Sequence, residues 1–119
     1  MERMMIQVKR IYEPAEAKDG YRVLVDRLWP RGVSKGEAKL DLWAKDVAPT
    51  TELREDFHAG KVSWEEFERL YRKELKEGLA LEELLKTIKG KERITLLFGS
   101  KDTEHNQAVV LANELATKM

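Results

Sequence analysis

Residues 26–35, DRLWPRGVSK, place one acid, three cations and a tryptophan in a single short segment that could bind an anion. They follow an apolar run that is predicted to be a strand, and open parallel sheets bind ligands beyond the carboxyl ends of their strands. Arg27 and Arg31 could hold a carboxylate or phosphate through paired N–H donors, and Asp26 is a candidate proton carrier. The predicted ligand-binding residues are Arg27, Trp29, Arg31 and Lys35, with Trp43 further along the chain. The alternative is architectural: Arg27 donates to backbone carbonyls and the tryptophan fills the core.

A second candidate loop, residues 99–106, follows the last apolar run of the chain. Gly99 permits a close backbone approach, and a helix that begins within the loop would present free N–H groups to an anion. Asp102 or Thr103 could instead cap that helix. His105 is the second candidate for moving a proton, because the first turn of a helix favours a neutral imidazole. The predicted ligand-binding residues of this loop are Gly99, Ser100, Lys101, Asp102 and Asn106.

Several classes of chemistry are excluded by what the sequence lacks. The absence of cysteine excludes a disulfide scaffold, a thiolate nucleophile and a cysteine-bound metal. The usual motifs of phosphate loops, dinucleotide sites, serine hydrolases and zinc proteases are missing. His58 and His105 are the only histidines and lie far apart in the sequence, so no metal site is predicted and the cofactor is left open. His58 is expected in the last turn of a helix, where a cation is favoured.

The charge balance bounds the partners and the compartment. The 22 basic and 22 acidic residues among 119 cancel to a net charge of zero. This balance argues against binding of nucleic acid through bulk charge, although a local basic patch stays open. No signal peptide or apolar run of bilayer length is found, so a cytoplasmic protein without a membrane partner is expected. The length predicts one domain over residues 1–119. The scarcity of side-chain amides is typical of heat-adapted proteins.

Periodic apolar patterns predict the elements that position the two loops. Strands are expected over residues 6–12, 21–25 and 94–98, and the last two should be inner neighbours because both are continuously apolar. Helices are expected over residues 40–45, 51–60, 64–78, 81–90 and 104–116, with Ser63 as a capping residue. This alternation predicts a small three-layer α/β/α domain with a mostly parallel sheet. Both loops would then face one cleft, where Asp26 could pair with Lys101 or Arg31.

Several motifs together resemble one family of small proteins. The chain is similar over nearly its whole length to the YeaO-like branch of the domain of unknown function 488 family. The resemblance implies a small cytoplasmic α/β domain and carries over no reaction, cofactor or catalytic residue. Gln107 stands where members often have a histidine, so the resemblance does not carry over a mechanism that needs two histidines on that helix. The motifs are DRLWPRG, Leu42-Trp43, residues 46–49 and 52–54, and Leu96-Leu97-Phe98 leading into Lys101-Asp102 and His105-Asn106.

The two loops support hypotheses from different classes. In the first, the cleft binds, and could act on, a small anionic metabolite that is phosphate- or nucleotide-like. In the alternative, the protein is a non-catalytic binding or regulatory module whose basic loop contacts a protein or structured RNA. A third hypothesis is assembly through the apolar face of the helix at residues 64–75. The sequence leaves open whether the protein is an enzyme and what its oligomeric state is.

Overall fold

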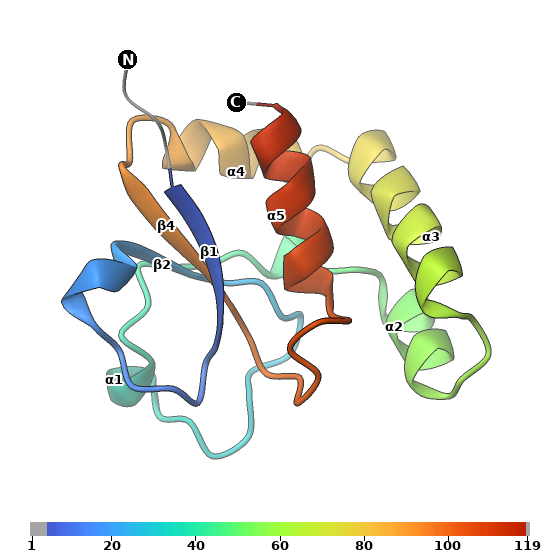
Figure 1. Ribbon diagram of the computed structural model, residues 1–119, viewed down its shortest axis with the longest axis horizontal. Helices are drawn as coiled ribbons and strands as arrows, with labels where there is room; N and C mark the ends of the chain where they lie inside the picture. Colours follow the sequence, from blue (N-terminus) through green and yellow to red (C-terminus); the bar gives the residue numbers. More distant parts are fainter. Residues whose placement is uncertain (1–4, 119) are drawn as a thin grey trace.

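The computed structural model describes residues 5–118, which form a four-stranded, all-parallel sheet with helices on both faces (Figure 1). The strand order is β1-β4-β2-β3. The prediction that the second and last apolar runs are inner neighbours is therefore confirmed. The strands are β1 (Met5–Arg10), β2 (Tyr21–Leu24), β3 (Leu42–Trp43) and β4 (Arg93–Phe98). The helices are α1 (Lys35–Ala38), α2 (Thr51–His58), α3 (Trp64–Glu77), α4 (Ala80–Ile88) and α5 (Gln107–Thr117), with 3-10 turns η1 (Ala17–Asp19) and η2 (Lys45–Val47).

The inner strands are mostly apolar because both of their faces are covered, and their buried polar side chains, Arg22 and Thr95, are hydrogen-bonded. On β4, Ile94, Leu96 and Phe98 enter the main core, whereas Leu97 points to the opposite face and joins a second cluster. All four side chains are buried. A parallel strand covered on both faces has no solvent side to mark with polar residues. The continuous apolar run is thus the direct consequence of a central position.

The two covering layers differ in thickness. Helices α3, α4 and α5 supply most of the main core, and α5 packs on β1 and β4 (Figure 1). The opposite face is covered by a thinner layer, in which Ala38 of α1 packs with Trp29 and Trp43 on the second cluster. This arrangement confirms the predicted three-layer α/β/α class. The DRLWPRG loop contributes Trp29 to this thin layer, whereas its Leu28 is exposed.

Helix α3 forms as its apolar periodicity predicts. Ser63 caps it, with Oγ accepting a hydrogen bond from the N–H of Glu66 at 3.1 Å. Phe67, Tyr71 and Leu75 are buried in the main core. The apolar face that could have served assembly therefore lies in this protein's own core.

Two predictions about helices are wrong. Residues 40–45 do not form a helix: Leu42 and Trp43 instead make the edge strand β3, because they pair in parallel with Val23 and Leu24 of β2. A long-range partner overrides a weak local preference here. The last helix begins at Gln107 and not at residue 104, because the preceding residues form a turn of their own.

Within residues 5–118, no helix combines the length and the hydropathy that a membrane span requires.

Candidate functional site

The carboxyl ends of β2 and β4 are joined by the side chain of Asp26. Its Oδ2 accepts a hydrogen bond from the backbone N–H of Gly99 at 2.8 Å. A Cβ atom at position 99 would lie 2.9 Å from this same oxygen. Glycine is therefore needed for the close approach that the sequence suggested, and the group that approaches is the Asp26 carboxylate.

The second oxygen of Asp26 is also occupied. Its Oδ1 accepts a hydrogen bond from the side-chain amide of Gln107, the first residue of α5. Burial raises the pKa of Asp26 to about 6, although the Gly99 N–H, the Gln107 amide and the charge of Arg54 all act in the opposite direction. Asp26 can therefore change its charge near neutral pH. The suggested pairing of Asp26 with Lys101 or Arg31 is wrong, because its partners are an amide and a backbone N–H.

A cavity of about 130 Å³ opens beside this carboxylate. It brings together three predicted residues, Asp26, Arg27 and Ser100, with three that the prediction did not include, Arg54, His58 and Gln107. A smaller cavity of about 20 Å³ shares Arg54, His58, Ser100 and Gln107 and extends to His105. The two predicted loops thus contribute to one region at the carboxyl edge of the sheet, and α2 closes it.

Arg54 is the least satisfied polar side chain of this region. Its Nε is buried and has no hydrogen-bond partner, and among residues 5–118 no other buried side-chain nitrogen or oxygen atom lacks one. Its charge acts on Asp26, yet the two residues form no ion pair within 4.0 Å. Arg54 and His58 stand four positions apart on α2, so they share one face of that helix. That i, i+4 spacing of two nitrogen-bearing side chains is the sequence signal that could have identified them.

Two of the three guanidinium nitrogens of Arg27 form hydrogen bonds within the fold. Its Nε donates to the carbonyl of Pro49 at 3.2 Å and its Nη2 donates to that of Ala48 at 3.1 Å. These bonds tie the end of β2 to the segment that precedes α2, as the architectural alternative proposed. Within residues 5–118, its Nη1 takes part in no hydrogen bond. Arg27 therefore keeps one donor nitrogen for a further partner.

The two tryptophans shape the loop and lie outside both cavities. Trp29 Nε1 donates to the carbonyl of Val33, and Trp43 Nε1 donates to that of Asp26, each at 2.7 Å. Their rings meet edge to face, with centroids 5.3 Å apart. With their N–H donors satisfied and their rings against each other, they hold the loop in place. Arg31, Lys35 and Lys101 are exposed and also lie outside the two cavities.

The second loop folds as a turn followed by a cap. Asp102 Oδ1 accepts hydrogen bonds from the N–H groups of Glu104 and His105, both at 2.9 Å, and these bonds hold the pKa of Asp102 below its usual value. Asn106 is the residue that caps α5, and its side chain accepts from the N–H of Val109. Asp102 and Asn106 are thus explained by local structure, and the expected cap at Asp102 or Thr103 is wrong.

His105 does not lie in the first turn of the helix, so the dipole argument for a neutral imidazole does not apply to it. It precedes the cap, and its ring packs against Trp64 with centroids 4.9 Å apart. Its Nδ1 lies 3.5 Å from Asp102 Oδ2. Within the described part of the chain, no group of three or more histidine, aspartate or glutamate side chains is placed to hold a metal ion.

Fold and site together define a small α/β protein with a basic cavity at the carboxyl edge of a parallel sheet. Residues 5–119 match the family model DUF488-N3i, described as the inactive DUF488-N3 subclade, and the chain belongs to that family. This agrees with the resemblance seen in the sequence motifs.

Curated relatives cover nearly the whole chain. "Uncharacterized protein YeaO" of Escherichia coli (strain K12) is 47% identical over 112 residues, which are 94% of this chain and 97% of the relative. "Uncharacterized protein Rv3073c" of Mycobacterium tuberculosis (strain H37Rv) and "Uncharacterized protein Mb3100c" of Mycobacterium bovis are each 40% identical over 110 residues, 92% of both chains. No solved structure matches the chain.

Proposed function

We propose that this protein is a cytoplasmic binder of a small, phosphate-like anion, which it holds beside Arg54 without turning it over. The observation that carries the proposal is the buried Nε of Arg54, which has no hydrogen-bond partner within residues 5–118. A buried N–H without an acceptor costs about 1–3 kcal/mol. An anion oxygen in the cavity would supply that acceptor and a charge of the right sign.

The charges around the cavity favour an anion. Arg27 and Arg54 carry two positive charges against the one negative charge of Asp26. Guanidinium groups match the geometry of phosphate and carboxylate oxygens. In a partly buried site these attractions are stronger than in water. The net charge of these side chains stays positive whether Asp26 is charged or neutral.

The size of the cavity narrows the ligand class. At about 130 Å³ it falls below the roughly 300–1,000 Å³ of sites that enclose drug-sized molecules. An inorganic anion or a single phosphate group suits this space, whereas a whole nucleotide exceeds it. The proposed ligand is therefore a phosphate-sized anion and not a whole nucleotide.

Binding without turnover is supported by how the possible catalytic groups are engaged. Both oxygens of Asp26 accept hydrogen bonds, and Ser100 Oγ accepts one from the N–H of Asp102. His105 faces Asp102, and its ring packs at a tilt against Trp64. The description of the matching family as inactive points the same way.

Calorimetric titration with inorganic phosphate and with sulfate at constant ionic strength tests the proposal. We expect saturable binding that also raises the melting temperature, since a ligand of the native state stabilises it by mass action. Arg54→Gln should abolish this binding and keep the fold, because it removes an unsatisfied buried donor. Arg31→Gln is the matched control and should bind as the parent does. No binding by the parent protein, or loss in Arg31→Gln and not in Arg54→Gln, would contradict the proposal; the latter would place the site on the exposed basic loop.

A further inference from the structure

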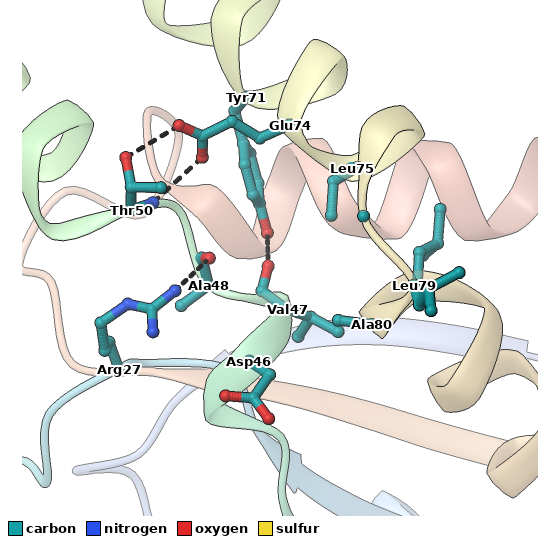
Figure 2. A pocket seen from close by; sticks show the side chains of 12 residues that line it. Arg27, Asp46, Val47, Ala48, Thr50, Tyr71, Glu74, Leu75, Leu79 and Ala80 are labelled. Carbon is teal, nitrogen blue, oxygen red and sulfur yellow. Dashed lines mark hydrogen bonds between the residues drawn. The ribbon is translucent and has the colours of Figure 1, made fainter.

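A further cavity, of about 280 Å³, lies between η2 and the corner that joins α3 to α4 (Figure 2). Its wall is divided by polarity. Figure 2 shows Arg27 and Asp46 on one side and Leu75 and Leu79 on the other. Its volume is near the lower end of the range for sites that enclose small molecules. A ligand that fills it needs a charged end and an apolar end.

Three polar side chains of this wall are already paired with each other or with the backbone. Tyr71 donates its hydroxyl proton to the carbonyl of Val47 at 2.5 Å. The two oxygens of Glu74 accept from the N–H of Thr50 at 3.0 Å and from its hydroxyl at 2.8 Å. These groups therefore shape the cavity and do not select a ligand.

The remaining polar groups are one cation and one anion. Within residues 5–118, Asp46 takes part in no side-chain hydrogen bond and no ion pair, and Arg27 is paired with no carboxylate. The two residues approach the same space without reaching each other within 4.0 Å. Such a pair is complementary to a ligand that carries one positive and one negative group close together.

The apolar side ends in an unusually placed leucine. Leu79 stands at the N-cap position of α4, where a side-chain oxygen is preferred, and it forms no capping hydrogen bond. It is 70% exposed at the edge of the cavity, whereas Leu75 behind it is buried. Leu79 does not stabilise the helix as a cap, and its exposed surface is available to cover an apolar group.

We propose that this cavity binds a free α-amino acid with an apolar side chain. Arg27 Nη1 donates to the carboxylate, Asp46 accepts from the ammonium group, and the side chain packs against Leu75 and Leu79. The site is separate from the anion cavity, although Arg27 contributes to the wall of both. A zwitterion is the ligand class that uses both unpaired charges and the apolar wall together.

Calorimetric titration with L-leucine and three truncated probes tests the assignment. The probes are 4-methylpentanoate, which lacks the ammonium group, 3-methylbutylamine, which lacks the carboxylate, and glycine, which lacks the apolar side chain. We expect L-leucine to bind and each probe to bind at least about tenfold more weakly. No binding of L-leucine, or equal binding of 4-methylpentanoate, overturns the assignment.

Variants locate the site and separate it from the anion cavity. Asp46→Asn and Leu79→Ser should each weaken L-leucine binding at least about tenfold. Leu28→Ser, which changes a leucine that is 63% exposed and lies outside this cavity, is the control and should bind L-leucine normally. Arg54→Gln should also keep L-leucine binding, so failure of the anion site leaves this test intact. Unchanged binding in both Asp46→Asn and Leu79→Ser rules out the cavity as the amino-acid site.

Discussion

The side-chain amide of Gln107 donates a hydrogen bond to Oδ1 of Asp26, which lies 81 positions earlier in the chain. The other oxygen of that carboxylate accepts from the N–H of Gly99. One aspartate thus joins the end of β2, the end of β4 and the first turn of α5. Position 107 therefore supplies the one side chain that donates a hydrogen bond to Asp26 within residues 5–118.

Gln107→His should create a histidine whose pKa lies above its ordinary value of about 6.5, because Asp26 stabilises the imidazolium. Two-dimensional NMR titration of the imidazole resonances measures this pKa directly. Gln107→Ala serves as the control, since it removes the amide and adds no titrating group. An introduced histidine that titrates at or below its ordinary value would show that position 107 does not reach the carboxylate in solution.

Asp26→Asn should change how stability depends on pH. The pKa of Asp26 is raised by burial from 3.8 to about 6, so the folded protein binds this proton more tightly than the unfolded chain. The free energy of unfolding contributed by this group therefore falls as the pH rises from about 4 to about 6, by at most about 3 kcal/mol. Urea denaturation at pH 4.5 and 7.5 should show this fall in the parent protein and not in Asp26→Asn. Asp56→Asn, on α2, is the control and should behave as the parent does.

Sulfate binding in the Arg54 cavity should strengthen as the pH falls from 7.5 to 5.5. Sulfate keeps its charge over this range, whereas Asp26 loses its negative charge near pH 6 and so repels the anion less. We expect an increase of about five- to tenfold in affinity, measured by calorimetry. The increase should shrink in Asp26→Asn, and His58→Gln separates any contribution of that side chain. An affinity that is flat with pH in the parent protein would contradict the placement of sulfate beside Asp26.

Asp19→Asn should destabilise the protein strongly. Asp19 is 1% exposed and pairs with Arg22, which is 4% exposed, at 2.5 Å. Burial alone would raise the pKa of Asp19, but hydrogen bonds from the Glu16 N–H, Lys9 and Arg22 hold it below 3.8. Removing one partner of a buried ion pair costs about 3–5 kcal/mol. Because the pKa is depressed, this stabilisation is present above about pH 4 and is lost as the pH falls further.

Chemical denaturation at pH 7 measures the cost of Asp19→Asn. Glu16→Gln changes an exposed neighbour of the same network and is the control, with a midpoint near that of the parent. Equal midpoints for the two variants would show that the buried pair contributes no more than the surface one.

Ser63→Ala and Asn106→Ala should both destabilise the protein by removal of a helix cap. Ser63 is exposed and accepts one N–H, so its loss should cost about 1 kcal/mol. Asn106 is 2% exposed and also donates to the carbonyl of Asp102 at 2.9 Å, so its loss should cost about 2 kcal/mol. Urea midpoints of the two variants check the order. An unchanged midpoint for Asn106→Ala would show that the loop does not depend on its cap.

The sequence by itself determined the central sheet and the long helices. Continuous apolar runs at Val23–Val25 and Leu96–Phe98 identified the two inner strands, because only a strand covered on both faces is apolar at every position. The apolar periodicity after Ser63 identified α3, and the glycine at position 99 indicated a close approach. In each case the prediction rests on residues that are neighbours in the chain, because such neighbours determine the local backbone conformation.

Only the tertiary structure decided which side chains meet. β3 has two residues and exists because β2 lies beside it, so no local pattern distinguishes it from a loop. The same applies to Asp26, whose partners Gly99 and Gln107 come from distant segments, and to Arg54, whose buried Nε depends on how α2 packs over the loops. A charged side chain in a loop can equally well face solvent or contribute to a binding site. Their role is decided by packing, because packing determines which of their donors and acceptors are left without a partner.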